Sequence, residues 1–375
     1  MFRIDVLGSR HGDCLIIHYG TSIPPKRILV DGGPHKVYRP FLRPHLRNLK
    51  ETEGLNKPVE FELAMVSHID QDHIIGLIEL TDEMIEEEDS TRDPARIKRF
   101  WHNSFSDLTG GTSPAALTAT VDAIVASANV AGTPPFQELA NSDGRATEIL
   151  ASVNQGRKLR DNLIRLGLDG NRPFNNALVL SGKSAELPGN MNLTVIGPDK
   201  ERLEKLQKEW NPALDPSEIA AITDNSVSNL ASIVVLAEHD GKKLLLTGDA
   251  RGDDIVEWLE ELGLKEKNKP FPVDALKVPH HGSNNNVDPA YFRAVPAKTY
   301  IYCGDGGHDN PEPETLKMMR EARQGDNYRV ILSSFVEMEH SAKQPEFEAE
   351  LKKLASAGIE VDARDPDDLF ISVDM

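Results

Sequence analysis

The sequence predicts an α/β protein in which two β-sheets pack together and helices cover their outer faces. Three observations predict this fold class. Short segments rich in β-branched residues recur in both halves of the 375-residue chain. Segments with helical apolar spacing follow many of them. Histidine and aspartate gather where several predicted strands end, which is the usual place for functional loops in α/β folds.

The first third of the chain alternates between strand and helix signals. "RIDVLG", "CLIIHYG" and "RILVDGG" are short, β-branched and bounded by glycine, proline or serine, so they predict strands. Residues 41–50 predict a short helix. "EFELAMVSH" predicts one strand, "IIGLIELTDEMIEEE" has the apolar spacing of a helix, and "ARIKRFWHN" predicts another strand.

The rest of the chain begins with a segment of different character. Residues 104–187 are mostly helical or loop-like, and we interpret them as a helical insertion or cap between the two halves of a single domain, 1–375. Strand signals then return in "MNLTVIGP", "ASIVVLAE", "KKLLLTGDA", "VDALKVPHHGS", "AKTYIYCGDGG", "YRVILSSF" and "LFISVDM". The segments "DDIVEWLEELG" and "PETLKMMREAR" predict helices between them.

Charge and cysteine content exclude some classes of function. The formal net charge of −18 argues against a broad basic face for duplex nucleic acid, although bound divalent ions would reverse the local sign in a cleft. Cys14 and Cys303 form no CxxC pair, which excludes a thiolate zinc site, and we expect both to be buried and reduced. No signal peptide or membrane span is evident, so a cytoplasmic protein is expected.

The segment "VSHIDQDHIIGL" places four ligand-type side chains within six residues. In an extended stretch alternate side chains point the same way, so His68 and Asp70 can reach one ion. Asp72 and His73 follow at the turn into the helix and can reach a second ion. Two ions about 3.5–4 Å apart form the clamp used to hydrolyse phosphoesters and related bonds. Imidazole and carboxylate together suit Zn, Mn or Fe better than Ca.

Further ligand-type residues end strands elsewhere in the chain. "LLLTGDA" ends a run of leucines in Asp249, whose carboxylate is well placed to bridge two ions. "LKVPHHGS" ends another strand in His280 and His281. "RILVDGG" places Asp31 at a strand end, directly before two glycines. The recurrence of this pattern argues against a surface loop that happens to contain histidines.

With these motifs in order, the chain resembles the hydrolases of the metallo-β-lactamase fold, an αββα sandwich. Asp31 matches the first family motif, Asp249 matches the bridging aspartate, and His281 matches the late metal-binding histidine. The HxHxDH motif is matched with Asp70 in place of its middle histidine. The segments "HGDCLII", "SHIDQDHIIGL", "LLLTGDA", "KVPHHGS" and "GDGGHDNPEPETL" resemble, more narrowly, the soluble hydrolase domain of the competence protein ComEC and its stand-alone relatives.

The resemblance implies two divalent metal ions, Zn or Mn, that share a hydroxide, with Asp72 and Asp249 among the catalytic residues. Because Asp70 is a hard oxygen ligand, we hypothesise a shift towards Mn. His102, at the end of a predicted strand, is the candidate for a further ligand that the family often supplies. The alternative is a histidine packed among aromatic residues.

The resemblance also implies residues around the metals. His280 would line the cleft and hold a phosphate oxygen or protonate a leaving group, and Ser283 could assist it. His308 and Asn310 are expected to contact substrate, with ordinary loop capping as the alternative. Asp31 and Asp13 are expected to orient ligand histidines, although a plain turn role explains Asp13 equally well. Surface or structural roles are expected for His11, His18, His35 and His45.

The function predicted from these residues is metal-dependent hydrolysis, with phosphodiester bonds as the leading substrate. A nuclease or phosphodiesterase leads, and the hydrolysis of a small nucleotide or another small ester is a close alternative. A different class stays open: an effector subunit of a multi-gene, anti-phage type of system, whose site is gated by a protein partner. The segment 104–187 is the expected docking place for such a partner. The oligomeric state is not predicted.

Overall fold

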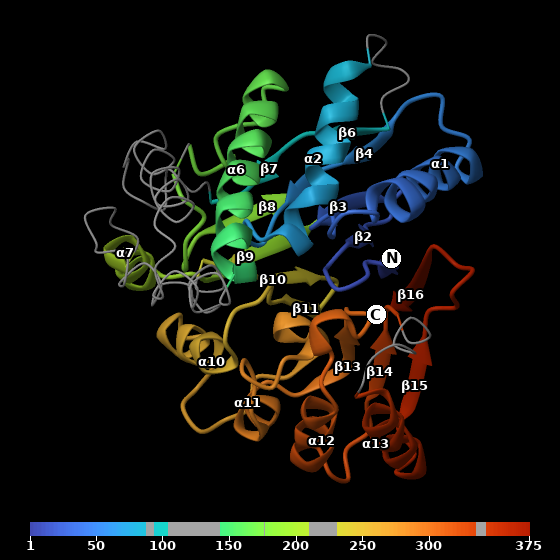
Figure 1. The fold of residues 1–375 in the computed structure, drawn as a ribbon, viewed down its shortest axis with the longest axis vertical. Coiled ribbons are helices and arrows are strands. Elements are labelled where there is room, and N and C mark those ends of the chain that lie inside the picture. Colours follow the sequence, from blue (N-terminus) through green and yellow to red (C-terminus); the bar gives the residue numbers. More distant parts are fainter. Residues whose placement is uncertain (88–93, 104–142, 176, 210–230, 335–342) are drawn as a thin grey trace, which may run out of the picture.

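The computed structural model describes residues 1–87, 94–103, 143–175, 177–209, 231–334 and 343–375. Two large sheets face each other in this structure (Figure 1). The first sheet has six strands, in the order β16 (Phe370–Asp374), β1 (Phe2–Leu7), β2 (Leu15–Tyr19), β3 (Lys26–Val30), β5 (Leu63–Met65) and β7 (Phe100–Trp101).

The second sheet has eight strands, and its central strands β11 to β14 run parallel. Its order is β15 (Glu360–Ala363), β14 (Arg329–Leu332), β13 (Ala297–Tyr302), β12 (Val273–Lys277), β11 (Lys242–Leu246), β10 (Val234–His239), β9 (Met191–Gly197) and β8 (Ser184–Leu187). Parallel strands bring their carboxyl ends to one edge, so the loops after β11 and β12 lie together.

Helices cover the outer face of each sheet (Figure 1). The first sheet carries α1 (Arg43–Thr52), α2 (Gln71–Glu86) and α6 (Asp143–Arg165). The second carries α10 (Gly252–Glu261), α11 (Pro289–Ala294), α12 (Pro313–Ala322) and α13 (Gln344–Ser356). Helix α7 (Lys200–Glu209) follows β9.

Three separate hydrophobic cores define the layers. The middle core joins the inner faces of the two sheets, with Ile4 and Val6 on one side and Val235 on the other. One outer core packs α1, α2 and α6 on the first sheet, and the other packs α10 to α13 on the second. The αββα sandwich predicted from the sequence is therefore confirmed.

Two segments that each predict one strand are broken in the structure. "EFELAMVSH" divides at Glu62 into β4 (Val59–Phe61) and β5, and "ARIKRFWHN" divides into β6 (Ala95–Ile97) and β7. Strands β4 and β6 form their own two-stranded sheet. At the first break Glu62 is buried, and its carboxylate contacts Lys26 at 3.0 Å and Lys98 at 2.9 Å.

The predicted insertion, 104–187, lies partly outside the described residues, which resume at Asp143. From there the chain belongs to the sandwich itself. In α6, Leu159 and Leu163 are buried in the outer core shared with α2, and Asn162 donates hydrogen bonds to Thr81 and Asp82. Strand β8 forms the edge of the second sheet.

In the described part of the chain, no helix combines the length and apolar character that a membrane span requires. Cys14 and Cys303 are free thiols and both are buried.

A buried polar network ties three strands of the first sheet to helix α1. Asp5 on β1 accepts hydrogen bonds from His18 of β2 at 2.8 Å and from His45 of α1 at 3.0 Å. Ser372 of β16 donates to its other oxygen, and Arg3 forms an ion pair with it. Burial alone would raise the pKa of Asp5, but these partners hold it well below its usual range. We interpret the group as structural because the carboxylate is already paired with a guanidinium.

The network predicts a pH effect on stability. Burial lowers the pKa of His18, although its hydrogen bond to Asp5 opposes the shift. Below about pH 6.5 the unfolded chain therefore binds a proton that the native state resists, and stability falls as the pH falls. His18→Gln keeps a donor for Asp5 but does not titrate. Urea unfolding at pH 7 and pH 5 is expected to show a smaller loss for the variant, by up to about 1.4 kcal/mol per pH unit. Equal losses in both proteins would contradict this assignment.

Candidate metal centre

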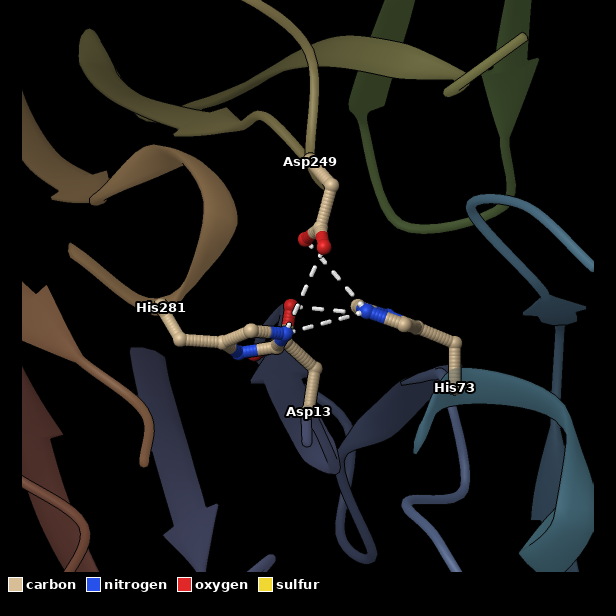
Figure 2. A group of neighbouring side chains, drawn as sticks. All are labelled: Asp13, His73, Asp249 and His281. Carbon is tan, nitrogen blue, oxygen red and sulfur yellow. Dashed lines mark hydrogen bonds and ion pairs between the residues drawn. The ribbon is translucent and has the colours of Figure 1, made fainter. Parts of the chain in front are cut away.

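The ends of strands from both sheets bring the predicted ligand residues to one place. Ser67 and His68 follow β5, and Asp72 and His73 begin α2. Asp249 follows β11, and the turn Pro279–Gly282 with His281 follows β12. Figure 2 shows Asp13, His73, Asp249 and His281 pointing towards one another. We call His68, Asp72, His73, Asp249 and His281 the ligand cluster.

Four side chains of the ligand cluster converge closely. The Nε2 atoms of His73 and His281 lie 3.2 Å apart, and His281 Nε2 is 3.1 Å from Asp72 Oδ2. The Asp249 carboxylate completes the group, with Oδ1 3.3 Å from His73 Nε2 and Oδ2 3.4 Å from His281 Nε2. These spacings are close to those between ligand atoms that share one metal ion.

Asp249 also faces a second group of donors. Its Oδ2 atom is 3.9 Å from His68 Nε2 and 3.5 Å from His280 Nε2. Asp70 Oδ2 lies 3.5 Å from the same His68 nitrogen. Asp249 thus lies near His68 as well as near His73 and His281, and His68 in turn converges with Asp72 and His73.

Asp31 and Ser67 orient the histidines that follow β5. Asp31 accepts hydrogen bonds from the Ser67 backbone at 2.7 Å and from the Ser67 hydroxyl at 2.8 Å. Asp31 Oδ2 also lies 2.9 Å from His73 Nδ1, and Ser67 Oγ lies 3.1 Å from His68 Nδ1. With the Nδ1 atoms held in this way, both Nε2 atoms are directed into the cluster.

Asp13 makes the corresponding contact on the other histidine. Its Oδ1 atom lies 3.1 Å from His281 Nδ1, and its Oδ2 atom forms a 2.5 Å ion pair with Lys277. Asp13, His281 and Lys277 are all buried. Asp13 therefore contacts a residue of the ligand cluster, which a plain turn role would not require.

The carboxylates and imidazoles of the ligand cluster shift one another's pKa values. Burial alone would raise the pKa of Asp72 and Asp249, but the neighbouring imidazoles of His73 and His281 hold both pKa values well below the usual range. Burial alone would lower the pKa of those two imidazoles, and the surrounding carboxylates raise it instead. The buried carboxylates thus favour positive charge beside them, which a divalent cation could supply.

The donor set fits a divalent metal ion. His68 Nε2 and Asp249 Oδ1 are buried and make no hydrogen bond within the described part of the chain, although both face other ligand-type atoms. Imidazole nitrogens mixed with carboxylate oxygens are the ligands that Zn and Mn accept. The buried His and Asp residues therefore form a candidate divalent-metal site.

The other predicted site residues lie around the cluster with more varied contacts. His280 has a side chain 22% exposed, and its Nδ1 atom lies 2.7 Å from Asn286 Oδ1. Ser283 is buried, and its backbone and hydroxyl stabilise the turn that follows His281. His308 lies in the loop after β13, where its ring meets that of His11. Asn310 accepts a hydrogen bond from the Gly306 backbone.

His102 lies at the end of β7, beside β5, but it belongs to none of the groups of converging ligand atoms in the described residues. It is buried, its ring packs edge-on against Phe100, and Asn171 binds its backbone N–H and C=O. These contacts fit the alternative of a packed histidine, and the ligand role of His102 stays a prediction.

Three residues near the cluster were not singled out from the sequence. Ser67 directly precedes the first ligand histidine. Lys277 is a charged residue inside the apolar segment "DALKV", and a lysine at such a position signals a buried partner. His11 was expected to have a surface or structural role; its ring lies 4.8 Å from that of His308, and burial lowers its pKa while the charge of Asp72 opposes the shift.

No family model and no curated protein matches the chain. Among solved structures it is similar to a Thermotoga maritima protein described as a candidate Zn-dependent hydrolase of the metallo-β-lactamase superfamily. The identity is 10% over 88% of this chain and 98% of that chain, with a TM-score of 0.32. It is also similar to Zn²⁺-bound PqqB from Methylobacterium extorquens, with 10% identity over all of both chains and a TM-score of 0.38. Both scores are low, and no substrate or residue role follows from them.

Proposed function

We propose that this protein is a hydrolase that uses two divalent metal ions, Zn or Mn, to cleave phosphodiester bonds. The observation that carries the proposal is the place of Asp249, a buried carboxylate that lies 3.9 Å from His68, 3.3 Å from His73 and 3.4 Å from His281. Such a carboxylate is suited to bridge two ions, as in dinuclear hydrolases.

We assign the residues to the two ions from their spacing in the sequence. His68 and Asp70 would hold one ion, and Asp72, His73 and His281 would hold the other, with Asp249 shared. When bound, the ions would supply Lewis acidity and a nucleophile that is available at neutral pH. Asp31 and Asp13 keep the ligand imidazoles in orientation through their Nδ1 atoms.

His280 is the residue best placed to serve the leaving group. It is partly exposed, lies beside Asp249, and its Nδ1 atom is held by Asn286, whose amide in turn donates to the Asp249 backbone. An imidazole fixed in this way can donate a proton to an alkoxide as the ester bond breaks. Neither the buried thiols nor Ser283 is needed as a nucleophile.

The choice of phosphodiesters rests on the ComEC-like motifs and on the histidines beside the cluster. His11 and His308, whose rings lie 4.8 Å apart, are the polar side chains that we expect to meet substrate, and we call this pair the substrate rim. A net charge of −18 disfavours long-range attraction of a polyanion. A small nucleotide or a short single strand therefore fits the molecule better than a long duplex.

The test is hydrolysis of bis(p-nitrophenyl) phosphate, single-stranded DNA, duplex DNA and RNA with added Mn or Zn. Asp72→Asn keeps the shape of the side chain but removes the charge next to His281. Cleavage by the wild type that is lost in this variant would establish the proposal. Cleavage of the small diester alone would identify a small-nucleotide enzyme. Two bound metals with no cleavage of any substrate would contradict a free-standing enzyme and would favour a site gated by a partner.

A substitution at His11 tests the substrate rim. His11→Phe keeps the edge-on ring contact with His308 but removes the hydrogen-bonding nitrogens. We expect KM to rise about fivefold to tenfold with kcat nearly unchanged, because one hydrogen bond to substrate is worth roughly 1–1.5 kcal/mol. Steady-state kinetics on the active diester gives both constants. An unchanged KM would show that the rim does not contact substrate.

A further inference from the structure

Lys277 is a buried, charged residue in contact with the candidate metal centre. It is the last residue of β12, two positions before the turn that carries His280 and His281, and its side chain is 1% exposed. Its ammonium group contacts three oxygens: Asp13 Oδ2 at 2.5 Å, the Gly248 carbonyl at 2.9 Å and Asp249 Oδ1 at 3.5 Å. All its partners therefore belong to the loops that form the centre.

A lysine in this position remains charged. Burial alone would lower the pKa of Lys277, but the carboxylates of Asp13 and Asp249 raise it above its usual range. A buried ammonium is tolerated only when it is paired and hydrogen-bonded, and here the partners are two carboxylates and a carbonyl. Burying an ammonium group in an apolar strand costs free energy, so we expect Lys277 to have a functional role.

The contacts of Lys277 continue to a ligand-cluster histidine. Asp13 uses one oxygen for Lys277 and the other for His281 Nδ1, so the three residues form a chain that ends at His281 Nε2. The backbone of His281 is in the left-handed region, with φ of 53°, and that of His280 has φ of 48°. Because the turn holds two non-glycine residues in this strained region, an anchor on the ring is needed to fix its direction.

The charge of the centre gives Lys277 a second effect. Five carboxylates lie at the site: Asp13, Asp31, Asp70, Asp72 and Asp249. Two divalent ions would leave one of these negative charges unbalanced, and the ammonium of Lys277 compensates it. Because Asp13 is already paired, it is not free to bind a metal, even though it lies within reach of His73, Asp249 and His281.

We propose that Lys277 is a positioning residue of the metal centre, which acts through Asp13 to fix His281 and to keep Asp13 out of the metal's ligand set. The inference deepens the proposed function and rests on its metal site. It does not depend on the substrate.

The experiment measures the affinity of the full chain for Mn²⁺ or Zn²⁺ by competition with a chromogenic chelator. Lys277→Met is expected to weaken binding about tenfold to a hundredfold, the usual cost of losing a residue that supports a metal ligand. Lys277→Arg, which keeps the charge, is expected to recover part of the affinity. The matched control is Lys265→Met, since Lys265 is also buried, 6% exposed, and pairs with Glu260 at 2.6 Å. It should lose stability but keep wild-type affinity.

A double-mutant cycle separates positioning from general damage to the fold. If Lys277 acts through Asp13, Lys277→Met in an Asp13→Asn background should cost no further affinity. The double variant also removes both buried charges together, so it remains usable if Lys277→Met alone does not fold. Wild-type affinity in Lys277→Met, or fully additive losses, would overturn the inference alone. Failure of the wild type to bind either metal would overturn both the inference about Lys277 and the proposed function.

Discussion

Asp249→Asn is expected to lower the rate of diester hydrolysis about a thousandfold or more and to reduce the metal content of the purified protein. Both carboxylate oxygens of Asp249 face imidazoles, with distances of 3.3 Å to His73 and 3.4 Å to His281. An amide has the same shape but no charge, and only its oxygen can bind a cation. A thousandfold loss corresponds to about 4 kcal/mol of transition-state stabilisation, the range expected for a bridging ligand.

Metal analysis and single-turnover kinetics on the same samples would check this expectation. Asp253→Asn is the matched control, because Asp253 lies four residues away, is 65% exposed and pairs only with Arg251 among its described ion pairs. The control should retain full activity and full metal content. If Asp249→Asn kept two metals and most of its activity, the bridging role would be wrong and the two donor groups would act independently.

Strand ends are the reason that so much of the centre could be predicted from the sequence. His68, Asp249 and His281 each follow an apolar run that becomes a strand, and parallel strands gather their carboxyl ends at one edge. The type of element and the type of ligand were therefore both visible in short segments. Which atoms meet was not visible, because the 3.2 Å approach of His73 to His281 joins residues 208 positions apart.

The strand boundaries that were predicted wrongly involve residues whose partners are distant in the sequence. Nothing within "EFELAMVSH" marks the break at Glu62, whose ion-pair partners are Lys26 of β3 and Lys98 between β6 and β7. Strand β15 was not predicted, because its sequence "EVDA" is short and polar and only its pairing with β14 makes it a strand. Pairing energy decides such edge strands more than local propensity does.

His102 shows that a histidine at the end of a predicted strand does not by itself identify a metal ligand. A histidine after an apolar strand is the same signal that located His68, and it predicted a ligand equally well. In the structure Asn171 binds its backbone and Phe100 packs against its ring. The direction of a side chain beyond a strand end depends on the loop that follows, and residues 104–142 lie outside the described part.

Close approaches of glycine backbones hold the loops of the centre together, and they lead to the second large effect. Gly32 donates a hydrogen bond to the His73 carbonyl at 2.8 Å, and Gly76 donates to the Gly33 carbonyl at 3.1 Å. A Cβ atom on Gly76 would lie 1.9 Å from the Gly32 carbonyl oxygen, so the two segments touch through backbone alone. This contact sets the 2.9 Å distance between Asp31 and His73.

Gly76→Ala is therefore expected to destabilise the protein by about 3 kcal/mol, at the upper end of the usual cost of overpacking, even though alanine favours a helix. Because the clash would push α2 away from Asp31, metal affinity should fall together with the unfolding midpoint. Urea unfolding and chelator competition measure the two effects.

The matched control is Gly156→Ala in α6, where a Cβ atom would meet the Ile69 side chain at 3.4 Å, an ordinary contact distance. That variant should be neutral or slightly stabilised, with unchanged metal affinity. Equal behaviour of the two alanine variants would show that the contact between Gly32 and Gly76 does not set the geometry of the centre.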